Sequence, residues 1–237
     1  MLNVIYEDNH IIIINKACGV VVQSDKTGDE TLLDIVKDYL KEKYNKPGNV
    51  FLGLPHRLDR PTSGIVVLAK TGKVLPRLNN LFQTRGEVKK TYWAVVDKRP
   101  PKYQDTLVHY LAKNQEKNRS YAYTEKKTGS KMASLTYRHV ASIEKYHLLE
   151  IELHTGRHHQ IRVQLRQLKL HIKGDIKYGF PRPNADKGIH LHARKIEFIH
   201  PVKKELLTVV AEPPDDPVWN ELMKMFRNNR FSPVSPV

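Results

Sequence analysis

Short runs of apolar and β-branched residues, most of them in consecutive hairpin order, constrain the fold of this chain most strongly. Residues 133–140 and 146–154 alternate apolar with polar side chains and are joined by a polar turn, which is the pattern of an antiparallel hairpin. Residues 3–6 and 10–14 form a second such pair around a Glu-Asp-Asn turn. Further strands are predicted at 20–22, 65–70, 89–96, 189–199 and 206–211.

Helix signals are fewer and lie between these strands. Thr31 begins a capping-box pattern, and the apolar residues after it share one helical stripe that we expect to be buried: Leu32, Ile35, Val36, Tyr39 and Leu40. Thr71 is expected to cap a helix that ends before Gly86, and two further helices are predicted at 158–168 and 217–226. The sequence therefore predicts an α+β fold with a largely antiparallel, mixed β-sheet and flanking helices.

The length of 237 residues suits one domain with a substantial core. We predict a single domain over residues 1–230 and a disordered, proline-broken tail at 231–237. Two consecutive prolines open a basic, weakly patterned segment within 98–131. We expect that segment to be a hairpin or loop insertion and not a second domain.

The charge of the chain is strongly positive and unevenly distributed. Lys and Arg number 40 against 25 Asp and Glu, which gives a net charge of +15. Residues 1–45 carry five basic and eight acidic side chains, whereas residues 154–204 carry twelve and three. One basic face is the expected footprint of a phosphate-backbone binder. We expect no membrane segment or signal peptide, and the single cysteine, Cys18, excludes an internal disulfide and indicates a cytoplasmic protein.

Three segments combine residue types that could perform chemistry, and each also has a plain structural explanation. In the run 56–64, Asp59 lies among arginines that favour the ionised carboxylate, although a surface ion-pair turn would look the same. In 89–93, Tyr92 stands among lysines on a predicted strand and could stack on a base or simply pack. In 153–162, Arg162 could pair with a distant carboxylate or belong to a solvated basic helix face.

Other catalytic classes fit the sequence less well. Histidines gather at 154–159 and 190–192, but arginine and lysine surround them and would oppose a divalent cation, so we expect no metal site. Ser63 lacks a nucleophile-elbow pattern, and no glycine-rich phosphate loop occurs. A two-carboxylate glycosidase would need a partner for Asp59 that is remote in sequence.

Five ordered motifs match one known family along nearly the whole chain. They are Val4–Asp8 with Asn15, Lys16 and Gly19; His56-Arg57-Leu58-Asp59-Arg60-Pro61-Thr62-Ser63-Gly64; Lys90-x-Tyr92; Thr155-Gly156-Arg157-His158-His159-Gln160-Ile161-Arg162; and Gly174-Asp175-x-x-Tyr178-Gly179 with Leu191-His192-Ala193. Each motif alone would be weak, but their order and spacing are specific. Together they resemble the RluA-type RNA pseudouridine synthases.

The resemblance implies a fold, a reaction and a set of site residues. The implied fold is the pseudouridine synthase fold, with a central catalytic cleft. Asp59 would attack the anomeric carbon of a target uridine, Tyr92 would stack on the uracil, and Arg162 would orient Asp59 through a salt bridge. The RNA-binding residues would be His56, Arg57, Arg60, Thr62, Lys90, Arg157, His159 and Gln160. The resemblance implies no cofactor and no metal, and we expect a monomer that binds a stem-loop of ribosomal or transfer RNA.

The chain departs from the family pattern at two places. Ala17 and Cys18 follow Lys16, where the family usually has proline, and His158 stands where threonine is more common. We expect a local turn change without loss of activity at the first place and altered RNA contacts at the second. We expect the small amino-terminal RNA-binding domain of many relatives to be missing, so that recognition would rest on the catalytic domain and on the basic segment 98–131.

Two rival functions remain compatible with the basic charge. A non-catalytic RNA-binding or ribosome-assembly protein on the same fold would need no acid in a basic cleft, which counts against it. A metal-dependent RNA hydrolase would require a cation site and would be inhibited by a chelator. RNA isomerisation is the function that the motifs predict.

Overall fold

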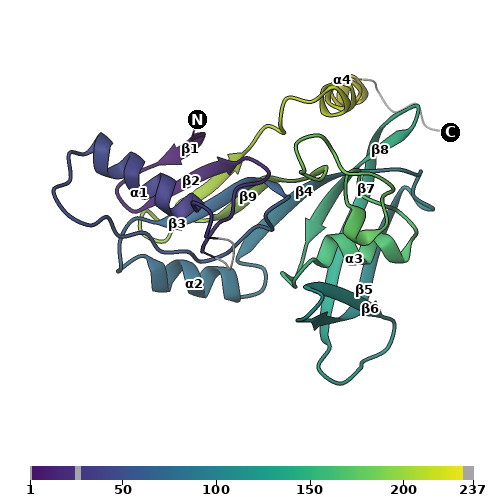
Figure 1. Ribbon diagram of the computed structural model, residues 1–237, viewed down its shortest axis with the longest axis horizontal. Coiled ribbons are helices and arrows are strands. Elements are labelled where there is room, and N and C mark those ends of the chain that lie inside the picture. The colour runs from purple at the N-terminus through teal and green to yellow at the C-terminus, as the bar shows by residue number, and fades with distance from the viewer. Residues whose placement is uncertain (1, 25–27, 232–237) are drawn as a thin grey trace. The chain divides into compact units, whose positions relative to one another are not determined.

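The computed structural model (Figure 1) describes residues 2–24 and 28–231. The contacts within the chain divide it into two compact units. Unit 1 comprises Met1–Lys90, Asp186–Gly188 and Ala193–Glu212, and unit 2 comprises Thr91–Ala185, Ile189–His192 and Pro213–Val237. Most of the predicted tail, residues 232–237, lies outside the described residues. The assignment of residues 1–230 to a single domain stays a prediction.

Unit 1 contains a sheet whose central strands are buried on both sides. Strand β1 (Val4–Glu7) pairs antiparallel with β2 (Ile11–Lys16), and β2 pairs antiparallel with β3 (Ser63–Ala69). The turn between β1 and β2 is fixed by Asp8, whose Oδ1 accepts hydrogen bonds from the amides of His10 and Ile11. The part of β9 (Leu191–Ile199) that belongs to unit 1 pairs antiparallel with β10 (Leu206–Val210).

Two helices complete unit 1. Helix α1 (Leu32–Lys43) begins with the predicted capping box, because Thr31 and Asp34 bond each other's backbone amides, and its buried residues lie on the predicted stripe. Helix α2 (Leu75–Gln83) starts later than predicted, because Thr71 closes a preceding turn through its carbonyl and does not cap the helix with its side chain. The strand predicted at 20–22 is wrong, since Val21 forms only an isolated bridge with Thr31.

Unit 2 is built on an antiparallel sheet in the order β4-β8-β7-β5-β6. The strands are β4 (Val88–Val96, its first residues in unit 1), β5 (Gln104–Asn114), β6 (Arg119–Tyr123), β7 (Lys131–Ile143) and β8 (Tyr146–Leu153). The basic segment 98–131 is therefore largely the β5–β6 hairpin, as predicted. Helices α3 (Gln160–Gln167) and α4 (Pro217–Phe231) and the 3-10 turn η1 (Ile176–Tyr178) complete the unit.

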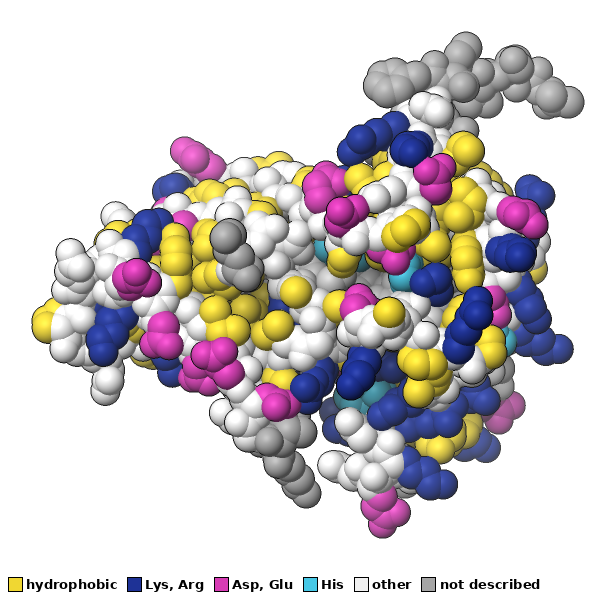
Figure 2. Space-filling view, turned by 45° about the horizontal axis from the view of Figure 1, so that its top comes forward, with side chains coloured by type: hydrophobic (Ala, Val, Ile, Leu, Met, Phe, Trp, Pro, Cys, Tyr) yellow, Lys and Arg dark blue, Asp and Glu magenta, His cyan; other side chains and the backbone are white. Residues whose placement is uncertain are grey.

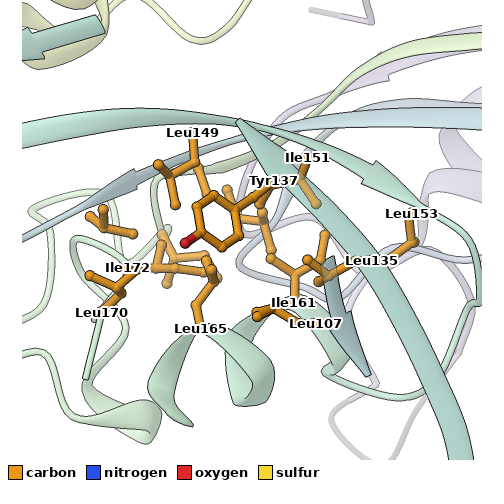
Figure 3. Close-up of a cluster of buried hydrophobic side chains, with 14 residues drawn as sticks. Leu107, Leu135, Tyr137, Leu149, Ile151, Leu153, Ile161, Leu165, Leu170 and Ile172 are labelled. Atoms are coloured by element: carbon orange, nitrogen blue, oxygen red, sulfur yellow. The ribbon is translucent and has the colours of Figure 1, made fainter. Parts of the chain in front are cut away.

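The two helices of unit 2 cover opposite faces of its sheet. Alternate residues of each strand point to opposite sides, so one set packs against α3 and the other against α4. Figure 3 shows the cluster on the first face, where Ile161 and Leu165 of α3 pack with Tyr137 and Ile151. On the other face, α4 packs its aromatic residues against Trp93, Val95, Ala141 and Leu148. We call these the α3 face and the α4 face. The antiparallel strands and flanking helices agree with the predicted α+β class.

Candidate active site

Asp59 lies in the turn that leads into β3 of unit 1. The Thr62 amide donates to the Asp59 carbonyl at 3.0 Å, so the turn closes on itself just before the strand begins. Asp59 is half-buried, whereas Leu58 and Thr62 are buried. Thr62 Oγ1 has no hydrogen-bond partner within residues 2–24 and 28–231. The turn therefore presents a carboxylate from a backbone anchored on both sides by buried residues.

Gly64 allows the close strand contact that places this turn. It has a φ of 111°, and a Cβ built on it would collide with the backbone of Ala193 in β9. A positive φ and a contact with backbone atoms both exclude a larger side chain. The glycine that ends the 56–64 motif is thus required by packing next to the turn.

Lys16 is a candidate site residue for which the sequence predicted no catalytic or RNA-binding role. It ends β2, is 1% exposed, and its Nζ donates to the carbonyls of Ala17 at 2.9 Å, Val20 at 3.0 Å and Arg60 at 3.2 Å. Burial lowers the pKa of the Lys16 ammonium to about 8, and the charges of Cys18 and Asp59 oppose that shift. Lys16 therefore holds the backbone next to Asp59 and places a cation near its carboxylate.

Arg60 is committed to the structure of the same turn. Its Nε donates to the Gly19 carbonyl at 3.0 Å, and its NH1 pairs with Asp29 Oδ2 at 2.7 Å. The Gly19 amide returns a bond to the Arg60 carbonyl at 2.9 Å. Arg57 and Arg60 both have exposed side chains. Of the two arginines predicted to bind RNA in this run, Arg60 is thus the one held by contacts with Gly19 and Asp29.

His56 packs within unit 1 as a neutral ring. Its Nε2 accepts a hydrogen bond from the Val67 amide at 2.9 Å, and the ring stacks on Phe82 with centroids 4.4 Å apart. Burial, with a smaller contribution from Lys90, lowers the pKa of His56 to about 3. Burial also lowers the pKa of Lys90. The RNA contacts predicted for these two residues stay predictions.

In unit 2, the loop before α3 is fixed by Gln160. Its Oε1 accepts from the Thr155 hydroxyl at 2.8 Å and from the Arg157 amide at 3.0 Å, and its Nε2 donates to the Ser134 carbonyl at 3.0 Å. Gln160 is 3% exposed and His159 is 8% exposed. Both side chains were predicted to contact RNA, and the structure shows them within the packing that shapes the loop, whereas Arg157 has an exposed side chain.

Arg162 is buried and forms a bidentate salt bridge with Asp175. Its Nε donates to Asp175 Oδ2 at 2.7 Å and its NH2 to Asp175 Oδ1 at 2.8 Å, and the two side chains are 5% and 1% exposed. Such a bidentate pair fixes both the position and the orientation of the guanidinium. Asp59 belongs to unit 1 and Arg162 to unit 2, so the predicted Asp59–Arg162 salt bridge stays a prediction.

Tyr178 supports this arginine from the side. The Arg162 guanidinium lies 5.0 Å from the Tyr178 ring centroid, and the guanidinium of Arg119 in β6 lies 5.1 Å from it. The Tyr178 hydroxyl accepts from the Ser120 amide at 2.8 Å and lies 2.9 Å from His159 Nδ1. Burial raises the pKa of Tyr178, and burial together with Arg162 lowers the pKa of His159 to about 2. This network links the β5–β6 hairpin to Arg162.

Tyr92 is the first strand tyrosine of unit 2 and packs on the α3 face. It lies opposite Ile151 in the ladder of β4 and β8 and is partly buried against the hydrophobic cluster of Figure 3. The predicted residues thus divide between the units. Unit 1 holds His56, Arg57, Asp59, Arg60, Thr62 and Lys90, and unit 2 holds Tyr92, Arg157, His159, Gln160 and Arg162.

The histidines that might have held a metal have other surroundings. His158 stacks on His159 with centroids 3.8 Å apart, and His190 contacts Asp216 and Asn184 at 2.9 Å each. Over residues 2–24 and 28–231, no group of three or more metal-ligating side chains is arranged to hold an ion. In the same part of the chain, no helix combines the length and apolar character needed to cross a bilayer.

Solved structures share this fold. The human RNA Pseudouridylate Synthase Domain Containing 4 matches with a TM-score of 0.77 and 24% identity, over 95% of this chain and 93% of that one. The human RNA Pseudouridylate Synthase Domain Containing 1 matches with a TM-score of 0.73 and 21% identity, over 100% and 97%. At these identities the likeness concerns the fold, and it confirms the α+β pseudouridine synthase fold predicted from the sequence.

Sequence relatives extend the comparison. An uncharacterized RNA pseudouridine synthase of Synechocystis sp. is 31% identical over 90% of this chain and 66% of its own length. The ribosomal large subunit pseudouridine synthase D of Zymomonas mobilis is 30% identical over 91% and 70%. The tRNA pseudouridine synthase C of Vibrio cholerae is 28% identical over 95% and 96%. The chain therefore spans about two thirds of the first two relatives and nearly all of the third.

The family described as RNA pseudouridylate synthase matches residues 10–167, a range that includes Asp59, Tyr92 and Arg162. The match covers more than half of the chain, and the named relatives are the RluA-type enzymes that the motifs resemble. The chain belongs to the RNA pseudouridylate synthase family, as its five ordered motifs predicted.

Proposed function

We propose that this chain converts specific uridines of structured ribosomal or transfer RNA to pseudouridine with Asp59 as the nucleophile. Family membership supports the reaction, and the names of the Zymomonas and Vibrio relatives support the two RNA classes. The observation that carries the choice of nucleophile is the turn itself. A half-buried Asp59 carboxylate is presented from a backbone that the buried Lys16 ammonium holds in place. An ionised, fixed carboxylate is what nucleophilic attack requires.

The chemistry balances without a cofactor or metal. An Asp59 oxygen bonds to the anomeric carbon of the uridine while the bond between ribose and uracil nitrogen breaks, and the electron pair leaves with the uracil. The uracil turns over and bonds to the same carbon through its carbon 5, which displaces the Asp59 oxygen. The hydrogen on carbon 5 then leaves as a proton, and the ring nitrogen gains one. Nothing is oxidised or reduced, so the step needs only a nucleophile, a stacking surface and proton transfer.

The remaining residues hold the nucleophile and the base. Tyr92 would stack on the uracil and assist removal of the proton, and Arg162 would pair with the Asp59 carboxylate while Asp175 fixes its guanidinium. Extruding the base from a stem-loop costs a few kcal/mol, which a stacking aromatic and an inserted arginine such as Arg57 offset. The protein would act as a metal-independent monomer in the cytoplasm.

Release of tritium from RNA labelled at carbon 5 of uridine tests this function. Wild type should release tritium, and Asp59→Asn should release none while it binds RNA as well as or better than wild type, because one negative charge facing phosphate is removed. Arg57→Ala serves as the control, because it changes an exposed residue of the same run. It should weaken RNA binding and retain turnover at saturating RNA. Residual turnover in Asp59→Asn would refute the nucleophile, and no release by wild type from total cellular RNA would favour a non-catalytic RNA-binding protein.

A further inference from the structure

The α4 face of unit 2 has one end that α4 covers and one end that it leaves exposed. Helix α4 packs on β7 and β8 near Ala141 and Leu148. At the opposite end of the same face, Val108 is 54% exposed, Met132 is 40% exposed and Tyr123 is 36% exposed. Within the described ranges 2–24 and 28–231, the hydrophobic clusters that include helix residues do not extend to these side chains. An uncovered apolar sheet end therefore remains on unit 2.

Tyrosines occupy neighbouring positions on this exposed end. Tyr110 lies opposite Met132 on one side and opposite Tyr123 on the other, and Tyr121 follows on the same face of β6. Directly opposite residues in an antiparallel pair bring their Cβ atoms to about 4.5–5.5 Å. Tyr110 and Tyr123 therefore lie next to each other on this face, Tyr110 half-buried and Tyr123 exposed. We call these two tyrosines the tyrosine platform, and Tyr121 lies beside it.

Positively charged side chains lie near this platform. Arg157 donates from Nε to the carbonyl of Met132, the residue opposite Tyr110, at 3.2 Å, and its side chain is exposed. The segment 98–131 carries nine Lys or Arg and three Asp or Glu, and Lys126, Lys127 and Lys131, which follow the hairpin, are exposed. Figure 2 shows Lys and Arg side chains gathered with hydrophobic ones at the lower right, over the region of the β5–β6 hairpin.

We propose that the tyrosine platform binds a single-stranded segment of the RNA substrate, with bases stacked on Tyr110 and Tyr123 and phosphates near Arg157 and the lysines that follow the hairpin. The proposal rests on the proposed function for the identity of the RNA. Aromatic side chains in a basic groove are the recurring means of holding single-stranded nucleic acid, because every base has a face that can stack. Each stacked base contributes about 1–3 kcal/mol, or roughly five- to 150-fold in affinity.

The charge pattern favours RNA over a protein occupant of the same surface. Protein interfaces are depleted in lysine relative to the rest of the surface, whereas the loop after the platform strands is rich in exposed lysines and Arg157 lies nearby. The platform also lies on the opposite sheet face from Tyr92, which packs on the α3 face. It cannot touch the same uracil as Tyr92, so its contribution belongs to RNA affinity and not to the chemical step.

Binding of two fluorescein-labelled oligonucleotides by the full chain tests the platform. The probes are a short oligoriboadenylate, whose bases stack strongly, and an oligouridylate of the same length. Wild type should bind the adenylate more tightly. The double variant Tyr110→Thr/Tyr123→Thr keeps strand propensity and loses both rings, so it should weaken adenylate binding at least tenfold. Tyr110→Phe/Tyr123→Phe should bind like wild type, because the phenyl ring still stacks.

Two further variants separate stacking from charge and from surface change. Arg157→Ala should reduce the slope of log affinity against log salt by about one, whereas the threonine double variant should leave that slope unchanged. Leu206→Thr changes an exposed strand residue of unit 1 and should alter neither quantity. In turnover of cellular RNA, the threonine variant should raise KM with kcat unchanged, whereas Asp59→Asn should abolish turnover.

Several results would refute RNA binding by the platform. They are wild-type affinity in the threonine double variant, equal loss in the phenylalanine and threonine variants, or no binding of either probe by wild type. Retained RNA affinity together with loss of binding to a protein would assign the surface to that protein. If wild type lacks turnover but the oligonucleotide results are as expected, the catalytic proposal is refuted and RNA binding by the platform is supported.

Discussion

Replacing Asp175 with asparagine tests whether Arg162 depends on the buried carboxylate that holds it. The two side chains are 1% and 5% exposed, and two hydrogen bonds of 2.7 and 2.8 Å join them. Removing one partner of a buried ion pair costs about 3–5 kcal/mol, because the remaining charge stays buried. Asparagine keeps the volume and one acceptor, so we expect a loss near 3 kcal/mol, which lowers the melting temperature by roughly 6–12 °C in a chain of this size.

The assay compares thermal unfolding and turnover in Asp175→Asn and a surface control. Glu221→Gln breaks an ion pair with Lys224 whose side chains are 51% and 67% exposed, so it should cost less than about 1 kcal/mol and leave turnover unchanged. Asp175→Asn should also lower kcat, measured well below its melting temperature, because the guanidinium loses its fixed orientation. Its affinity for RNA should be nearly unchanged. Equal melting temperatures in the two variants, or wild-type kcat in Asp175→Asn, would refute the reasoning.

Three further predictions concern packing and pH. Gly64→Ala should abolish folding, seen as loss of soluble protein and of the native circular dichroism spectrum, whereas Gly72→Ala, which meets no atom within 4 Å, should fold normally. His56 has a pKa lowered to about 3, so the unfolded state takes up a proton at this residue before the folded state does as the pH falls below about 6.5. In urea unfolding, wild type should therefore lose about 1.4 kcal/mol of unfolding free energy per pH unit from this group between pH 6 and 4. The His56→Gln variant should lose correspondingly less. Tyr178→Phe should cost about 1–3 kcal/mol in the same urea assay, because the buried Ser120 amide loses its acceptor, and unchanged stability would show that water replaces the hydroxyl.

The local parts of the fold were predictable because local patterns determine them. The capping box at Thr31, the hairpin of β7 and β8 and the hairpin in the basic insertion follow from residues a few positions apart. The strand expected at 20–22 failed for a related reason. Three apolar residues indicate burial, but Val21 has only the single bridge to Thr31 and no strand along which to form a ladder.

The polar contacts of the candidate site were less predictable, because they join residues that no sequence pattern pairs. Asp175 lies in a recognisable motif, yet the motif does not show that its carboxylate forms a salt bridge with Arg162. Gln160 was expected to bind RNA because its motif resembles that of the RluA-type enzymes, and its amide nitrogen donates to the Ser134 carbonyl within the loop packing. A buried polar group must find partners, and which partners are near depends on the folded arrangement of distant strands.

Lys16 and the arginines show how this arrangement separates structural cations from those available to RNA. The Lys16 ammonium is committed to three carbonyls, the Arg60 guanidinium to Asp29 and Gly19, and the Arg162 guanidinium to Asp175. Each of these cations fixes a segment of a predicted motif, and each has lost much of its capacity to follow a mobile phosphate. Arg57 and Arg157 carry exposed side chains beside the same motifs. The cations of the motifs therefore differ in role: Lys16, Arg60 and Arg162 fix segments within their own units, and we expect Arg57 and Arg157 to supply salt-dependent affinity for RNA.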